Sequence, residues 1–145
     1  MMEGQPEIHC IFCRIIAGQV PTVRLYEDEK TFSFMDSNPT SDGHCLVIPK
    51  RHSVTLFDIS EEDITAVMKT VRKVTLAIKE SLNPAGLVVY QLNGRAAGQA
   101  IDHLHVHLVP RYESRGLDLT HGIRAGDREK IKAVGEKIAA VFVNK

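Results

Sequence analysis

Residues 103–109 alternate histidine with aliphatic side chains, in the order His-Leu-His-Val-His-Leu-Val. Successive side chains of a strand point to opposite faces of a sheet, so this pattern predicts a strand with three imidazoles on one face. The aliphatic side chains would then face the core. Because three histidines on one face contribute little to packing, we interpret that face as a chemical site.

Two kinds of chemistry suit a row of imidazoles. Neutral imidazoles are common zinc ligands, and a histidine can also act as the nucleophile of a covalent reaction. An ordinary histidine has a pKa of about 6.5 and is largely neutral at neutral pH, as both roles require. The turn before the strand, Ala96 to Gln99, is made of small residues whose backbone N–H groups can approach an anion closely. The row and the turn together indicate a phosphate pocket.

The rest of the sequence predicts an α+β domain. Apolar residues recur at spacings of three and four from Ser60, the expected N-cap of a long helix, to Asn83, where the helix should end. A C-terminal helix should start at Asp127. Further strands are predicted at Leu25–Tyr26, Thr31–Asp36, Cys45–Ile48 and Leu87–Leu92, and Pro49 and Pro110 should each stop a strand. We therefore expect about five mostly antiparallel strands, with helices on one side and the other face available for a site.

Composition narrows the class of protein. The chain has 145 residues, of which we expect 1–9 to form a flexible tail and 10–145 a single domain. Eighteen Lys and Arg balance eighteen Asp and Glu, without the basic excess typical of nucleic-acid binding. No apolar run approaches the roughly 20 residues of a membrane span, and the polar N-terminus resembles no targeting peptide. Three cysteines, an odd number, favour a reducing compartment. We expect a cytoplasmic protein with no nucleic-acid or membrane partner.

The histidine segment also resembles a known family. Gly98-Gln99-x3-His103-x-His105-x-His107-x2-Pro110-Arg111 is similar to the signature of the histidine triad (HIT) family. Three more blocks extend the resemblance over residues 10–112, namely Cys10-Ile11-Phe12-Cys13, Phe34-x-Asp36 and the stretch from Gly43-His44 to His52. The pattern is most similar to small, bacterial-type, Hint-like members. The resemblance implies one HIT domain with a long central helix and a C-terminal helix.

The resemblance implies a reaction and roles for four histidines. Members cleave the bond between the α-phosphorus of a nucleoside monophosphate group and its leaving group, through a covalent nucleotidyl-histidine. Hint-like members act on purine nucleoside phosphoramidates. His105 would be the nucleophile, and His107 would contact the α-phosphate and assist the leaving group. His103 would orient the nucleophile, and His44 would stand beside the triad. No catalytic metal is expected.

The resemblance also implies a binding site for a purine nucleotide. Gln99 and Gly98 would bind near the phosphate, and Asp36 would bind both ribose hydroxyls. Leu92 stands where relatives often carry a polar residue. Its neighbour Asn93 would bind near the phosphate in its place if the turn begins at Asn93. The base would lie against Ile11, Phe12, Ile15, Phe34 and Leu46, with Met35 at the purine edge. By themselves these apolar residues would be interpreted as core.

Cys10 and Cys13 have the spacing of zinc ligands. Resemblance to bacterial members implies a structural zinc held by both cysteines together with His52 and His103. A redox pair is a weaker interpretation, because thioredoxin-type motifs follow a strand and this pair precedes the first one. Two half-buried thiols without a metal are a further alternative.

Several functional alternatives stay open. The substrate could be a dinucleoside polyphosphate, as in a sister branch. The protein could be a nucleotide-binding regulatory module with little catalysis, because Leu92 and Ala100 replace polar residues common in relatives. The triad could also form a catalytic zinc site. The resemblance further implies a symmetric homodimer, formed partly through the long helix and a sheet edge.

Overall fold

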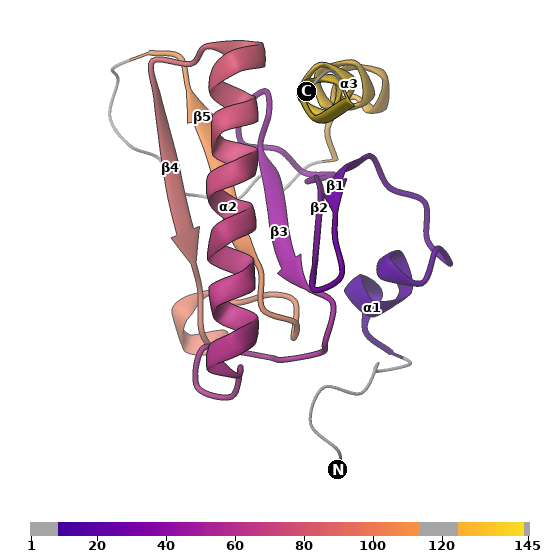
Figure 1. Ribbon diagram of the computed structural model, residues 1–145, viewed down its shortest axis with the longest axis vertical. Helices are drawn as coiled ribbons and strands as arrows, with labels where there is room; N and C mark the ends of the chain where they lie inside the picture. The colour runs from indigo at the N-terminus through magenta and orange to yellow at the C-terminus, as the bar shows by residue number, and fades with distance from the viewer. Residues whose placement is uncertain (1–8, 114–124, 144–145) are drawn as a thin grey trace.

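The computed structural model describes residues 9–113 and 125–143, so the predicted tail lies outside the described residues except for His9. One antiparallel sheet has the strand order β1-β2-β3-β5-β4 (Figure 1). Its strands are β1 (Arg24–Glu27), β2 (Thr31–Met35), β3 (Cys45–Pro49), β4 (Gly86–Gln91) and β5 (Val106–Arg111). The helices are α1 (Ile11–Ile16), α2 (Glu61–Leu82), the 3-10 helix η1 (Arg95–Ala97) and α3 (Arg128–Val143). The predicted α+β class is confirmed.

Helix α2 begins and ends where the sequence predicts. The Ser60 hydroxyl accepts a hydrogen bond from the backbone N–H of Asp63 at 3.0 Å, which satisfies one unpaired donor of the first turn. Asn83 ends the helix in the left-handed conformation, with φ of 47°. Most of the apolar stripe of α2, including Val67, Val71 and Ile78, is buried against the sheet, whereas Met68 is exposed.

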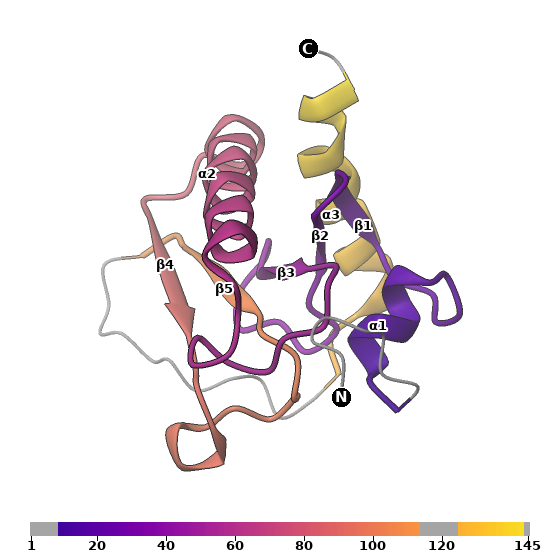
Figure 2. The ribbon, with the colours of Figure 1, turned by 60° about the horizontal axis from the view of Figure 1, so that its bottom comes forward.

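Helix α3 completes the layer on the same face of the sheet. The Asp127 carboxylate accepts the N–H of Glu129 at 3.0 Å at the start of this helix, as its predicted position requires. Ile138 is fully buried, and α3 packs beside α2 and against β1. Figure 2 shows α2 above β3 and β5, and α3 alongside β1 and β2. The main core therefore lies between these two helices and the sheet, and it leaves the opposite face for other contacts.

The alternation of residues 103–109 is confirmed, but the strand predicted there is partly wrong. Strand β5 begins only at Val106, so His103 and His105 precede it. The chain before Val106 leaves the sheet and pairs with the loop after β3, where the N–H of Leu104 donates to the carbonyl of Ser53 at 2.7 Å. Leu104 nevertheless joins the core beneath α2, and the histidines lie on the other side.

Pro110 does not stop β5, contrary to the prediction. Its carbonyl accepts a hydrogen bond from the Ser41 hydroxyl at 2.6 Å and so points away from β4. In an antiparallel strand the N–H and C=O of one residue point to the same side. The missing N–H of Pro110 would therefore face the side of β3, whose pairing with β5 already ends at Leu108. The pairing of β5 with β4 therefore loses no backbone hydrogen bond at Pro110 and continues to Arg111.

Helix α1 was missed by the sequence analysis. It is six residues long, and isolated helices of that length are unstable. Tertiary packing holds it, because Phe12 and Ile15 enter a second core with Phe34 and Leu46 on the sheet face opposite α2. The i, i+3 spacing of these two α1 residues was the available signal. The second core forms one wall of the candidate site.

Candidate active site

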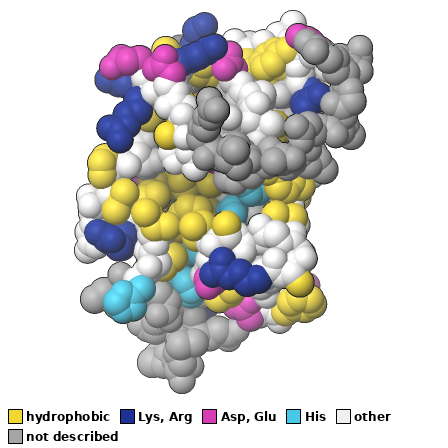
Figure 3. All heavy atoms as spheres, turned by 180° about the vertical axis from the view of Figure 1, so that it is seen from behind, with side chains coloured by type: hydrophobic (Ala, Val, Ile, Leu, Met, Phe, Trp, Pro, Cys, Tyr) yellow, Lys and Arg dark blue, Asp and Glu magenta, His cyan; other side chains and the backbone are white. Residues whose placement is uncertain are grey.

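A cavity of about 700 Å³ opens on the sheet face opposite α2. His105 and His107 line it, together with Asp36 and many apolar side chains. From behind, apolar side chains gather in the middle of this face with histidines among them (Figure 3). A cavity of this size and character is typical of small-molecule sites.

His105 has a defined tautomer. Its Nδ1 lies 2.7 Å from the backbone carbonyl of His103, and a carbonyl only accepts, so Nδ1 carries the proton. In the neutral ring the lone pair is then on Nε2. The edge-on ring of Phe12, with centroids 5.2 Å apart, packs against the imidazole. Only 7% of His105 is exposed. Nε2 is therefore the unprotonated nitrogen of the neutral ring, on a residue that lines the cavity.

His107 is held by a chain of hydrogen bonds that begins at the backbone. The N–H of Thr40 donates to Nδ1 of His44 at 2.9 Å, so the proton of neutral His44 is on Nε2. That nitrogen lies 3.0 Å from Nδ1 of His107 and donates to it. Neutral His107 therefore carries its proton on Nε2. The predicted fourth histidine is thus in direct contact with the triad.

Asp36 lies beneath the cavity beside this histidine pair. One carboxylate oxygen accepts the N–H of Asn38 at 2.8 Å, and the other lies 3.4 Å from Nε2 of His44. The side chain is almost fully buried yet lines the cavity. A carboxylate accepts hydrogen bonds without donating any, so Asp36 suits a ligand that carries hydroxyl groups.

The structure brings the predicted apolar wall together. Phe12 and Phe34 meet edge to face with ring centroids 5.4 Å apart. The cavity is lined by all six residues predicted to contact the base, which are Ile11, Phe12, Ile15, Phe34, Met35 and Leu46. Five of the six are also core residues, so the two interpretations of them are compatible, whereas Ile11 is exposed and belongs to neither core.

The residues predicted near the phosphate are distributed differently. Gly98 lines the cavity with φ of +95°, a conformation that favours glycine. The side chain of Gln99 is buried inside the loop instead. Its amide donates to the carbonyls of Val54 and Ile101 at 2.7 and 2.9 Å and accepts from the N–H of Gly94. Gln99 thus holds together, from within, the loop that carries Gly98 at the border of the cavity.

Asn93 also points away from the cavity. Its side chain pairs with that of Gln91 and accepts the N–H of Leu56 at 2.7 Å. Leu92, its neighbour, lines the cavity in its place. This follows the opposite orientation of adjacent residues at the end of a strand.

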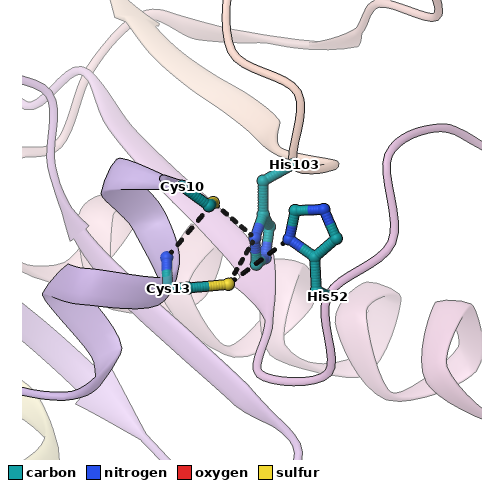
Figure 4. Close-up of side chains that lie close together, drawn as sticks. All are labelled: Cys10, Cys13, His52 and His103. Atoms are coloured by element: carbon teal, nitrogen blue, oxygen red, sulfur yellow. Dashed lines mark hydrogen bonds between the residues drawn. The ribbon is translucent and has the colours of Figure 1, made fainter. Parts of the chain in front are cut away.

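A second cluster lies at the other end of the histidine row. Cys10, Cys13, His52 and His103 converge from α1, the loop after β3 and the segment before β5 (Figure 4). Sγ of Cys13 lies 3.3 Å from Nδ1 of His52 and 3.6 Å from Nδ1 of His103. Around tetrahedral zinc, bond lengths of about 2.3 Å to sulfur and 2.0–2.1 Å to nitrogen place such neighbours about 3.5 Å apart. The donor set and its spacing fit a metal of this kind.

His103 is oriented for that role. Its Nε2 donates to the carbonyl of Pro49 at 2.8 Å, which leaves the lone pair of Nδ1 directed at the cysteine sulfurs. A hydrogen bond of this kind on the outer nitrogen is typical of metal-binding histidines. Burial lowers the pKa of His103 to about 4, against partial compensation by the Pro49 carbonyl. The imidazole is therefore neutral at neutral pH, as a ligand must be.

Sequence reasoning missed part of the cavity. Tyr90 stacks on His107, with ring centroids 4.2 Å apart and planes within 9°. It falls in a predicted strand, but no motif distinguished it. Leu92 and Ala100 had been noted only as departures from relatives. The other unpredicted lining residues are Val20, Pro21, Thr22, Ser37, Asn38 and Ile101, whereas Ala97 belongs to the turn predicted to line a phosphate pocket.

Fold and site together define an α+β domain with a row of alternating histidines beneath a nucleotide-sized cavity. Residues 17–114 match the family described as HIT domain. The chain belongs to this family.

Relatives agree along most of the chain. It is 41% identical over 132 residues to an adenosine 5′-monophosphoramidase of Schizosaccharomyces pombe, covering 90% of this chain and 96% of that protein. It resembles the crystal structure of a Hit-like protein from Bartonella henselae with a TM-score of 0.85 and 36% identity, covering 92% of this chain and 96% of that one. A zinc-bound histidine triad protein from Mycobacterium smegmatis matches with a TM-score of 0.82 and 31% identity, covering 94% and 95% of the two chains.

Proposed function

We propose that this protein hydrolyses purine nucleoside 5′-phosphoramidates to a nucleoside monophosphate and an amine. One observation carries the proposal: the His103 carbonyl holds the Nδ1 proton of His105, and this directs a nucleophilic Nε2 to a cavity that also contains Asp36 and His107. The similarity to an adenosine 5′-monophosphoramidase supports the same substrate class.

The cavity suggests how the nucleotide binds. The purine would pack against the wall that includes Phe12 and Phe34, and the ribose hydroxyls would donate to the carboxylate of Asp36. The α-phosphate would then lie beside His105 and His107, near the backbone of Gly98. This pose places phosphorus within reach of Nε2 of His105, and proximity of that kind contributes much of a catalytic effect.

The proposed reaction has two displacements at phosphorus. In the first, a bond forms between Nε2 of His105 and the α-phosphorus, the bond from phosphorus to the amine nitrogen breaks, and that nitrogen keeps the electron pair. It takes a proton from Nε2 of His107, which acts from its imidazolium form; in that form Nδ1 is also protonated and would donate to the Asp36 carboxylate instead of accepting from His44. In the second, water attacks phosphorus, the bond to His105 breaks, and the proton released by water returns to His107. Asp36 supplies the negative charge that balances the imidazolium.

We propose that Cys10, Cys13, His52 and His103 hold a structural zinc ion. A bound zinc would cross-link three segments of the chain and fix the backbone at His103. That backbone carbonyl orients His105, so His103 serves both the cluster and the nucleophile. The displacement steps need no metal at the phosphate, because imidazoles supply both the nucleophile and the acid.

The charge of the cavity favours phosphoramidates over dinucleoside polyphosphates. Among the described lining residues there is no lysine or arginine, so a leaving group with several phosphates would find no counter-charge there. The regulatory-module alternative rests on Leu92 and Ala100, which offer no side-chain hydrogen bond to a phosphate.

We also propose a homodimer in the cytoplasm. Strand β4 is an edge of the sheet, and Val89 on β4 and Met68 and Leu76 on α2 are exposed apolar residues that a second copy would cover. Cys10, Cys13 and Cys45 form no disulfide with one another, as a reducing compartment favours. No helix in residues 9–113 and 125–143 combines the length and apolar character of a membrane span.

Release of AMP from adenosine 5′-phosphoramidate, beside the same assay with diadenosine tri- and tetraphosphate, tests the proposal. We expect turnover of the phosphoramidate to exceed that of the polyphosphates. Faster polyphosphate cleavage would support the first alternative. Tight AMP binding without turnover of any substrate would support the regulatory module.

A further inference from the structure

The stacking of Tyr90 on His107 is a contact that the reaction as described does not use. Tyr90 of β4 and His107 of β5 are paired across the ladder, and both line the cavity. Their rings are nearly parallel, at 9°, with centroids 4.2 Å apart. Contact over a full ring face restricts the plane in which an imidazole lies. The contact between His105 and His107 is edge-on, at 60°, and restricts that plane less.

His44 and Tyr90 constrain His107 in complementary ways. The 3.0 Å contact from His44 determines which nitrogen accepts, and the Tyr90 face determines the plane in which the ring lies. Together they set the direction of the bond from Nε2 to its proton. A hydrogen bond to a leaving nitrogen weakens steeply with misalignment, so this direction matters for proton transfer.

The phenol face also favours the charged form of His107. A cation over an aromatic face within about 6 Å of its centroid is attracted by the ring quadrupole. The titratable groups that surround His107 are Tyr90, His44, Asp36 and His105. Burial raises the pKa of Tyr90, and the charge of Asp36 raises it further. The phenol therefore stays neutral and attracts an imidazolium only through its ring face.

We infer that Tyr90 is a positioning residue that holds His107 as the proton donor to the leaving group. This inference rests on the proposed function. It makes a prediction about leaving groups: an amine must be protonated as it departs, whereas 4-nitrophenolate departs as a stable anion. Loss of Tyr90 should therefore slow the departure of an amine and spare that of a nitrophenolate.

The test compares adenosine 5′-phosphoramidate with the 4-nitrophenyl ester of AMP. We expect Tyr90→Leu to lower kcat about three- to tenfold for the phosphoramidate and less than about twofold for the ester, with little change in KM. Tyr90→Phe keeps the ring face and should retain both activities. Val88→Ala, on the same strand and face but outside the cavity lining, is the matched control and should not alter the ratio of the two rates.

An equal fall in both rates for Tyr90→Leu, or no fall, would overturn the inference while leaving the proposed function intact. Wild-type protein that hydrolyses neither substrate would overturn the proposed function instead. NMR relaxation of the His107 ring then tests the positioning alone. Because His44 selects the tautomer, we expect the same tautomer in all three proteins, with a rigid ring in wild type and Tyr90→Phe and a mobile ring in Tyr90→Leu. A ring that is equally rigid in Tyr90→Leu would contradict the inference.

Discussion

The two ends of the histidine row differ in what surrounds them. At one end His103 is fully buried among two thiols and a second imidazole. At the other end His107 lies between a tyrosine face and His44, at the edge of an open cavity. His105 stands between the two ends, in contact with both.

The difference shows how neighbours assign roles to identical side chains. Neutral His103 keeps its proton on Nε2 through the Pro49 carbonyl and presents Nδ1 to the cysteines. Neutral His105 keeps its proton on Nδ1 through the His103 carbonyl and presents Nε2. His107 accepts at Nδ1 and presents a donor. One closed end suited to a metal and one open end suited to phosphate chemistry therefore arise from three hydrogen bonds.

The largest expected effect is on the residue between the two ends. His105→Ala should lower kcat by at least roughly 10³-fold, because it removes the proposed nucleophile. Binding of AMP should persist, since the base wall and Asp36 are unchanged. The measurement is steady-state turnover beside equilibrium AMP binding. Turnover near that of wild type would show that another group attacks phosphorus.

The closed end should govern stability. Cys13→Ala should lower the free energy of unfolding by about 3 kcal/mol in the presence of zinc, because binding of the metal to the native state no longer contributes. Thermal unfolding with and without a chelator measures this. The chelator should destabilise wild type and the control Cys45→Ala, whose thiol lies in the main core, but not Cys13→Ala. Chelator sensitivity that survives in Cys13→Ala would contradict the proposed ligand set.

Lowering the pH should reduce the stability that the closed end contributes. The pKa of His103 is about 4 in the folded protein against 6.5 when unperturbed, so the unfolded chain binds its proton first as pH falls. This contribution to stability is full above pH 6.5 and is lost as pH falls toward 4. For chelated protein we expect a loss of roughly 2–3 kcal/mol over that window. Denaturant unfolding at several pH values measures it, and His103→Gln, which cannot titrate, should flatten the dependence.

The smallest of these effects should come from the open end. His44→Ala should lower kcat for a phosphoramidate about tenfold, because His107 loses the donor that selects its tautomer. Zinc content should not change, since His44 is not among the residues of the closed cluster. Metal analysis beside kinetics tests both statements. Loss of zinc together with activity would mean that the two ends are not separable.

Much of this arrangement was predictable from periodicity and motif. The Ser60 cap and the apolar stripe of the long helix gave its position, and the period of two placed the histidines opposite the core. The resemblance identified the apolar wall and the Cys-His cluster, whose residues the structure brings together. These features depend on local sequence or on a shared pattern.

The rest depends on contacts distant in the sequence. Helix α1 is too short to be stable without its packing on β2 and β3. The late start of β5 follows from pairing with the loop at Ser53, and the retraction of Gln99 follows from bonds to Val54 and Ile101. Tyr90 is opposite His107 only because of the register between β4 and β5. No single segment encodes these relations.

The most direct test of the central claim is to trap the covalent intermediate. Wild-type protein is mixed with adenosine 5′-phosphoramidate, quenched in base within one turnover, and digested for mass spectrometry. The account predicts an adenylyl group on the peptide that contains His105, located on that residue by fragmentation and missing from His105→Ala. Rapid AMP release with an unmodified His105 peptide, or an adenylyl group on His107 instead, would contradict it.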